Sequence, residues 1–315
     1  MKTIIVPLDG STLAEQVLPY VELYASLLHA EVVLVRVVTD EEQQQFRLLH
    51  AADASIRLLP LPEPPHEVDV PLILAERARA YLDTQMGCLQ TAGLSVAVSV
   101  RTGSPAEAIA EVASRYTDPL IMLATHGYSG LRRWTLGSTA DRVVHIANVP
   151  VFVVRARAEA AQPLTLRRVL VPLDGSALAA QALPVALELA GAARAELILL
   201  QAVLPFNELA PAFAPLGRPI PMPVALLDEE HERVRRQLRT MAEQLSRPEL
   251  TVTPAAELGY PADVILDEAE KYHADLIVLA THGRSGLRHW VLGSVADKVL
   301  HATRTPLLLV RASDA

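Results

Sequence analysis

The chain contains two copies of nearly the same sequence, and this repeat restricts the possible folds more than any other feature. The hexapeptide VPLDGS at residues 6–11 returns unchanged at residues 171–176. Residues 124–156 return at residues 280–312 with 20 of 33 positions identical. Because the matching segments lie at the start and the end of each copy, the repeating unit is a whole domain of roughly 150 residues. We therefore expect two similar domains, and whatever the repeated residues bind can be bound twice.

The length of 315 residues agrees with a two-domain chain. We predict a first domain at residues 1–156, a linker at residues 157–166 and a second domain at residues 167–315. The linker is assigned from its alternating small and polar residues and from Pro163. Proline-rich segments at residues 60–65 and 205–223 are predicted to be stiff loops, either plain surface loops or lids over a site.

Apolar runs alternate with segments of helical periodicity in both copies. Residues 3–8 and 168–173 are short apolar runs, typical of buried strands, and each is followed by apolar residues at helical spacing. Strands that alternate with helices predict a parallel sheet connected by right-handed crossovers. The predicted fold class is α/β, with two tandem doubly wound five-stranded domains that are Rossmann-like. We expect the strand order 3-2-1-4-5 in each domain and a pseudo-two-fold axis between them.

Composition excludes several classes of protein. The net charge of -8 disfavours a nucleic-acid partner, which requires a clustered basic surface. No apolar run reaches the roughly 20 residues that span a bilayer, so no membrane partner is expected. The single Cys88 excludes an internal disulfide and a cysteine-rich zinc site. We expect a cytoplasmic protein.

The motif most informative about chemistry is a glycine-containing loop that leads into a helix. In the first copy it runs from Ala124 through Gly127 and Gly130 to Gly137 and Ser138. Glycines allow close approach of backbone N–H groups to a ligand, and a helix N-terminus carries unpaired donors and partial positive charge. The loop therefore suits a phosphate group. The alternative is that the glycines only shape turns and that the serine only caps a helix.

With this loop and the Asp-Gly-Ser after the first strand, the chain resembles a tandem universal stress protein over nearly its whole length. ATP-binding members of that family carry Gly-x2-Gly-x9-Gly-Ser/Thr in the loop and an Asp at the end of the first strand. Here the loops read Ala124-x2-Gly127-x9-Gly137-Ser138 and Ala280-x2-Gly283-x9-Gly293-Ser294, so both copies have alanine at the first glycine. The resemblance implies that the chain binds ATP. Whether Mg²⁺ binds together with the ATP is left open by the sequence.

The resemblance also implies roles for residues outside the loop. Asp9 and Asp174 are expected to face the nucleoside part, where a carboxylate accepts hydrogen bonds from ribose hydroxyls or helps to hold a metal ion; the alternative is an Asx turn. Backbone groups at Val37 and Ala202 are expected to read the adenine edge. The predicted nucleotide-binding residues are Asp9, Val37, Ala124, Gly127, Gly130, Gly137, Ser138 and Thr139 in the first half, and Asp174, Ala202, Ala280, Gly283, Gly286, Gly293, Ser294 and Val295 in the second. Arg284 stands where the first copy has Tyr128, so tighter binding is expected in the second half.

Motifs of several common enzyme classes, namely P-loop NTPases, dinucleotide-binding enzymes and serine hydrolases, do not occur. The sequence has no Gly-x4-Gly-Lys-Ser/Thr, no Gly-x-Gly-x-x-Gly after the first strand and no Gly-x-Ser-x-Gly. No general base is recognisable, so ATP hydrolysis is expected to be slow at most. The leading hypothesis is an ATP-binding regulator of the stress response. The alternative is a nucleotide-independent tandem domain that acts through protein association.

The last strand of each half is apolar on both faces. Residues 151–154 and 307–310 are expected to lie at sheet edges, and bare apolar edges invite aggregation. We therefore predict that the two edges pair with each other, antiparallel, within the chain. A homodimer is a further state that the sequence leaves open.

Overall fold

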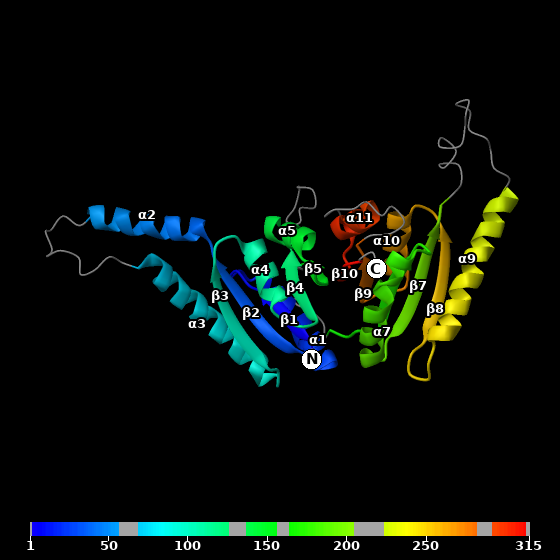
Figure 1. Cartoon of the computed structure of the whole chain (residues 1–315), viewed down its shortest axis with the longest axis horizontal. Helices are drawn as coiled ribbons and strands as arrows, with labels where there is room; N and C mark the ends of the chain where they lie inside the picture. The colour runs from blue at the N-terminus through cyan, green and yellow to red at the C-terminus, as the bar shows by residue number, and fades with distance from the viewer. Residues whose placement is uncertain are drawn as a thin grey trace, which may run out of the picture. The chain divides into compact units, whose positions relative to one another are not determined.

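The computed structural model of the chain describes residues 2–56, 69–125, 137–155, 164–204, 224–281 and 292–312 (Figure 1). These described residues fall into two compact units, the first ending at residue 149 and the second beginning at residue 150. None of their helices is long and apolar enough to cross a membrane.

The first unit is built on four parallel strands in the order β3-β2-β1-β4. Its strands are β1 (Thr3–Pro7), β2 (Glu31–Val38), β3 (Val96–Thr102) and β4 (Pro119–Thr125). Ile4 and Ile5 in the central strand β1 are both inaccessible to solvent. Because successive side chains point to opposite faces, the sheet is covered on both sides, as expected for a doubly wound fold.

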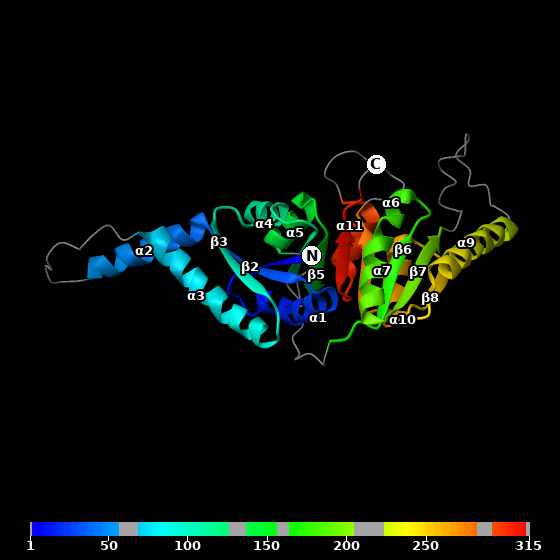
Figure 2. The same cartoon turned by 60° about the horizontal axis from the view of Figure 1, so that its bottom comes forward.

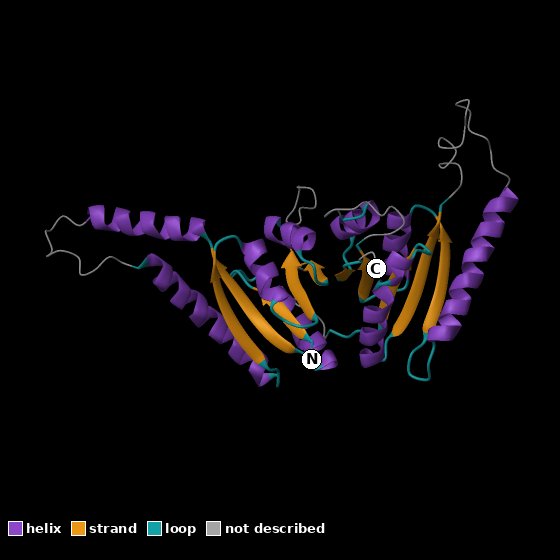
Figure 3. Cartoon of the chain, in the orientation of Figure 1, coloured by secondary structure: helices purple, strands orange, loops and turns teal. Residues whose placement is uncertain are grey.

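Helices cover the first sheet (Figure 3). They are η1 (Ala14–Val17), α1 (Leu18–Leu28), α2 (Asp40–Ile56), α3 (Val70–Thr91), α4 (Pro105–Ser114) and α5 (Ser138–Ile146). Helix α3 packs on β2 and β3, and α4 packs against α5.

Helix α2 is an element that the sequence analysis did not predict. Its first turn is fixed by a capping box, in which Glu42 N–H donates to Thr39 Oγ1 at 3.1 Å and Thr39 N–H donates to Glu42 Oε2 at 2.9 Å. The helix buries Phe46 but leaves Leu48 and Leu49 exposed. Over residues 40–49, where its side chains are described, Phe46 is the one buried apolar residue, so this part of the helix shows little of the buried apolar stripe that marks most helices of a globular core.

The second unit has six strands in the order β5-β10-β9-β6-β7-β8. They are β5 (Val151–Arg155), β6 (Arg168–Leu173), β7 (Glu196–Val203), β8 (Val252–Leu258), β9 (Leu276–Ala280) and β10 (Leu307–Val310). β5 is antiparallel to β10, with Val153 opposite Leu307, and the other neighbours are parallel.

The helices of the second unit lie on both faces of its sheet. They are α6 (Ala177–Ala180), α7 (Ala182–Ala193), α9 (Val224–Leu245), α10 (Pro261–Lys271) and α11 (Ser294–Ala302). Helix α9 runs along β7 and β8, as Figures 1 and 2 show. Helix α10 packs against α11. Right-handed crossovers place α7 and α9 on one face and α10 and α11 on the other.

The predicted α/β class with largely parallel strands is confirmed, and so is the order 3-2-1-4-5 in the second half, as β8-β7-β6-β9-β10. Strands one to four of the first half also take the predicted order, while β5 is grouped with the second unit. The domain limits, the pseudo-two-fold axis and the pairing of whole domains stay predictions. Residues 60–65, 205–223 and most of the predicted linker lie outside the described residues.

Candidate functional site

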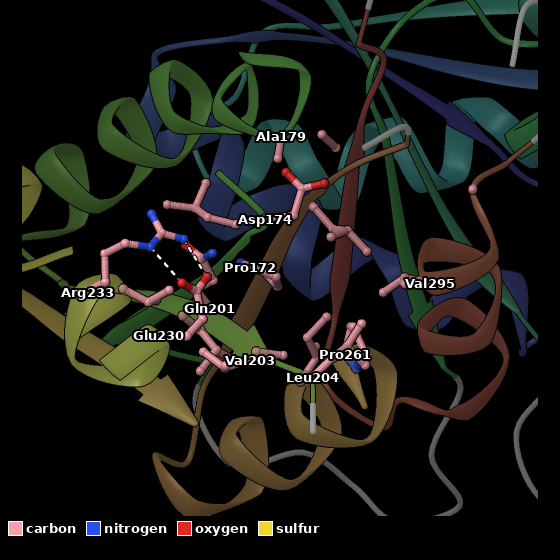
Figure 4. Close-up of a pocket in the computed structure, with 18 of the residues that line it drawn as sticks. Pro172, Asp174, Ala179, Gln201, Val203, Leu204, Glu230, Arg233, Pro261 and Val295 are labelled. Atoms are coloured by element: carbon pink, nitrogen blue, oxygen red, sulfur yellow. Dashed lines mark hydrogen bonds and ion pairs between the residues drawn. The ribbon is translucent and has the colours of Figure 1, made fainter. Parts of the chain in front are cut away.

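A cavity of about 1050 Å³ opens in the second unit at the carboxyl ends of its parallel strands. The residues that line it come mainly from β6, β7, β9, α6, α9, α10 and α11, and Figure 4 shows 18 of them. The sheet order reverses direction beside β6, which has β9 on one side and β7 on the other. Ligands of open α/β sheets bind at such a switch point. Six predicted residues line this one cavity: Asp174, Ala202, Ala280, Gly293, Ser294 and Val295.

The start of α11 supplies N–H donors to the cavity. The N-cap N–H of Gly293 is already bonded to the carbonyl oxygen of Thr281 at 2.8 Å, and the first bond within the helix is from Asp297 N–H to Gly293 O at 2.9 Å. The intervening residues 294–296 therefore have N–H groups without an acceptor inside the helix. All three residues line the cavity. This helix end can accept an anion.

The opposite end of α11 is stabilised by a cation. Arg155 of β5 donates from Nη2 to the carbonyl oxygens of Leu300, at 2.9 Å, and of His301. These carbonyls belong to the last turn, where the helix carries partial negative charge and where positive side chains are favourable. The contact ties α11 to the β5–β10 pair and so fixes the helix whose N-terminus faces the cavity.

Asp174 adopts the Asx turn that was the alternative to a ligand-binding role. Its Oδ1 accepts the N–H of Ser176 at 2.9 Å, and Gly175 has a φ of 81°, which favours glycine. Ser176 then caps α6 by accepting the N–H of Ala179 at 3.1 Å. The turn explains Asp-Gly-Ser locally. The side chain also lies on the cavity wall, so the turn does not prevent it from facing a ligand.

The end of β7 presents backbone to the cavity. The carbonyl of Val203 accepts the N–H of Gly259 at 3.0 Å, which directs the peptide groups of Val203 toward β8. Successive residues of a parallel strand alternate in direction, so those of Ala202 point toward β6. The last pair in the register of β6 and β7 joins Leu173 to Gln201, so Ala202 lies beyond the end of β6.

Helix α9 gives the cavity a wall of net negative charge. Its lining side chains include the acidic Asp228, Glu229, Glu230 and Glu232 and the basic Arg233 and Arg236. Arg233 is occupied by its neighbours on the helix: its Nε donates to Glu230 at 2.7 Å, a pair that Figure 4 shows, and its Nη1 donates to Gln237 at 3.0 Å. The ring of His231 bonds to the carbonyl oxygen of Ala256 in β8 at 2.8 Å, which fixes the helix to the sheet.

The described predicted residues of the first half also lie at the carboxyl ends of strands. Asp9 follows β1 in an Asx turn, accepting Ser11 N–H at 2.9 Å. Ala124 is in β4, Gly137 is the N-cap of α5, and Ser138 and Thr139 are the first, exposed residues of that helix.

Val37 differs from its counterpart in the second half. Its carbonyl oxygen accepts a hydrogen bond from Nη1 of Arg36 at 2.5 Å. The same guanidinium donates from Nη2 to Glu42 of α2. The backbone group that was predicted to read adenine therefore already has a side-chain partner.

Side chains also join η1 to α3 in the first half. Glu15 accepts hydrogen bonds from the Tyr81 hydroxyl at 2.9 Å and from Gln85 Nε2 at 3.2 Å. Burial, followed by this bond to the Glu15 carboxylate, raises the pKa of the Tyr81 phenol well above its ordinary value of 10.0. The protonated phenol is favoured in the folded chain.

We predict that Tyr81 ionises later than an ordinary tyrosine. Because its folded pKa is raised, it contributes stability below its unfolded pKa near 10.0, and that stability is lost as the pH rises above this value. Tyr81→Phe should remove one late-ionising phenol from an alkaline titration of tyrosinate absorbance. It should also flatten the alkaline fall in the free energy of unfolding. A titration in which the variant loses a phenol that ionises near the ordinary value would contradict the assignment.

The remaining predicted residues, Gly127, Gly130, Gly283 and Gly286, lie outside the described residues, as do Tyr128 and Arg284. Within the part of the chain that is described, no group of three or more histidine, cysteine or acidic side chains could hold a metal ion.

Sequence reasoning missed the side chains that distinguish the two halves near the carboxyl ends of their strands, namely Arg36, Glu15 and Tyr81 in the first half and Gln201 in the second. A readable signal existed for one pair. The 165-residue repeat offset aligns Arg36 with Gln201, one residue before the backbone positions assigned to adenine.

Comparison with known proteins gives one family for both halves. Residues 1–155 and 165–311 match the model of the universal stress protein family. A universal stress protein of Mycolicibacterium smegmatis is 30% identical over 230 residues, which are 71% of this chain and 72% of that protein. One from Synechocystis is 26% identical over 318 residues, covering 99% of this chain and 100% of that protein.

The fold is likewise found among solved structures. The crystal structure of a universal stress protein from Archaeoglobus fulgidus superposes with a TM-score of 0.71 at 20% sequence identity. The match covers 99% of this chain and 98% of that one. At this identity, the likeness concerns the fold.

Proposed function

The chain belongs to the universal stress protein family, and we propose that it binds ATP in the cavity of its second unit. One observation carries the proposal: six predicted residues, spread from Asp174 to Val295, line a single cavity together with the N-terminus of α11. The cavity volume of about 1050 Å³ is at the upper end for small-molecule sites, which suits a ligand as large as a nucleoside triphosphate.

The polar groups suggest an orientation for the ligand. Phosphate oxygens would accept the N–H groups of residues 294–296, where the helix end favours negative charge. The acidic wall of α9 repels phosphate and leaves that side to the uncharged base and sugar. The backbone of Ala202 offers a donor and an acceptor to the edge of adenine, and Asp174 offers an acceptor to a ribose hydroxyl.

These groups bind but do not form a set of reacting groups. A hydrolase needs a base within hydrogen-bond reach of the attacking water, and the residues assigned here already have binding or structural roles. We infer that the bound nucleotide acts as a regulatory ligand in the cytoplasm, where stability or partner choice depends on occupancy. Hydrolysis, where it occurs, is slow.

The direct test is to identify what the protein retains. Mass spectrometry of ligand released from denatured, freshly purified protein is expected to detect adenine nucleotide, and calorimetry of stripped protein is expected to detect ATP binding. A protein that carries no nucleotide and binds none on titration contradicts the proposal. It favours nucleotide-independent protein association instead.

Asp174→Asn tests the role of the carboxylate. Asparagine retains an Oδ1 acceptor for the N–H of Ser176, so the Asx turn remains while the charge is lost. The affinity for ATP should fall roughly tenfold, as expected for losing one hydrogen bond to a charged group. Asp9→Asn is the matched control, because it makes the same change in the same turn of the first unit. Calorimetry that finds wild-type affinity for ATP in a folded Asp174→Asn protein would refute a role for Asp174.

A further inference from the structure

The two halves carry different side chains at one equivalent position of the second strand. The repeat offset of 165 residues pairs Arg36 with Gln201 and Val37 with Ala202. Both pairs lie at the carboxyl ends of their strands, β2 and β7. A cationic side chain in one half therefore stands where the other half has a neutral amide.

In the first half, Arg36 bonds to the strand end itself. The N–H of Gly103 donates to Val38 O at 3.0 Å, so the peptide groups of Val38 face β3 and those of Val37 face the β1 side. The Val37 carbonyl corresponds to the Ala202 carbonyl, which points beyond the end of β6. Arg36 Nη1 donates a hydrogen bond to the Val37 carbonyl oxygen at 2.5 Å.

Helix α2 holds Arg36 in this position. The Arg36 side chain is only 16% exposed, and its Nη2 forms an ion pair with Glu42. Glu42 is itself fixed, because its Oε2 accepts the N–H of Thr39 at 2.9 Å in the capping box. A ligand that pairs with the Val37 carbonyl must first displace a guanidinium that has two partners.

The second half lacks this arrangement at the equivalent position. Gln201 is buried, lines the cavity and carries no charge, and Ala202 beside it also lines the cavity. The tie between η1 and α3 is different as well. The offsets of 165 and 156 residues align Glu15 with Ala180 and Tyr81 with Gln237, so the carboxylate that accepts the phenol is replaced by a methyl group.

We infer that Arg36, held by Glu42, is a specificity-determining residue that keeps nucleotide from the Val37 carbonyl of the first half, so that the chain binds one ATP, in its second half. The inference rests on the proposed function of the second cavity. It replaces the expectation of one nucleotide per half. The gap in affinity between the halves should be roughly 10- to 100-fold, the range for breaking hydrogen bonds of a charged group.

A reciprocal exchange of the two residues tests the inference. Calorimetric titration of stripped full-length protein with ATP should give one site for the wild-type chain. Arg36→Gln gives the first half the residue of the second and should give two sites. Gln201→Arg makes the opposite change and should reduce ATP binding at least tenfold. Glu42→Gln releases Arg36 without altering it and should also reveal a weaker second site.

Arg115→Gln is the control, because Arg115 is half-exposed and paired with Glu111 within α4, and it should leave one site. Urea unfolding of each variant identifies any loss of folding. Two sites in the wild-type chain, or one site in a folded Arg36→Gln variant, would overturn the inference and leave the proposed function intact. If the wild-type chain binds no ATP, the proposed function is contradicted. If the Arg36→Gln variant also binds no ATP, the inference about Arg36 is contradicted too.

Discussion

Val153→Glu is expected to destabilise the second unit by about 3–5 kcal/mol, because it places a carboxylate in an apolar, closed strand pair. Val153 is 4% exposed and lies opposite Leu307 in the antiparallel register of β5 and β10. Its neighbours Phe152 and Val154 are also buried, so both faces of β5 are covered. Its cross-strand partner, Leu307, has no charge that could pair with the new carboxylate. Urea unfolding measures the loss.

The pH dependence separates charge from shape in this variant. A buried glutamate has a raised pKa, so the Val153→Glu protein recovers stability as the pH falls through that raised pKa, and the recovery is complete below the ordinary value of about 4.3. Val153→Gln has nearly the same shape and should show a loss that does not change with pH. Leu49→Glu is the surface control, because Leu49 is 70% exposed, and it should change stability by no more than about 0.5 kcal/mol. A Val153→Glu protein as stable as the control would contradict the buried pairing of β5.

The strand pair also bears on how the halves are joined. β5 is the last strand of the first repeat and pairs with β10, the last strand of the second. We propose that this pairing satisfies the N–H and C=O groups that two separate edge strands would leave open. If so, Val153→Glu should raise the binding of a hydrophobic dye as well as lower stability, because it exposes apolar edge residues.

The fold was predictable from the sequence because its signals are local and occur twice. Apolar runs such as residues 168–173 mark buried strands, and the same pattern recurs at the equivalent place in the other repeat, which strengthens each prediction. Helix α2 escaped this reasoning because its first half, residues 40–49, is largely polar and buries only Phe46. The Thr39-x-x-Glu42 capping box was nevertheless a readable start signal, and the structure forms it with both hydrogen bonds.

The cavity in the second half was predictable for a similar reason. Its residues lie at strand ends and at a helix start, positions that sequence patterns identify directly. The difference between the halves was not predictable in this way. The contact between Glu15 and Tyr81 joins residues 66 positions apart, and the bond from Arg36 to the next carbonyl depends on a side-chain conformation that no periodicity specifies.

Val295→Glu is expected to reduce the affinity of the second half for ATP on the order of 100-fold at low salt, the effect of two like charges about 6 Å apart near a protein surface. Val295 is the second residue of α11, is half-buried and lines the cavity beside the proposed phosphate position (Figure 4). A carboxylate in the first turn of a helix stabilises the helix by about 0.3–1 kcal/mol, so the fold should tolerate the change. Calorimetry with ATP measures the loss.

Two further variants assign that loss to charge at this helix end. Val295→Gln has the shape of the glutamate variant without its charge and should lose far less affinity, and the gap between the two should narrow as salt screens the repulsion. Thr139→Glu makes the same change at the second residue of α5, in the half whose Val37 carbonyl is bonded by Arg36, and on the inference above it should leave ATP binding unchanged. Equal affinities of the Glu and Gln variants at every salt concentration would mean that phosphate does not lie at the start of α11. The adenine and ribose contacts at Ala202 and Asp174 would then have to account for binding alone, and the Asp174→Asn variant measures that contribution separately.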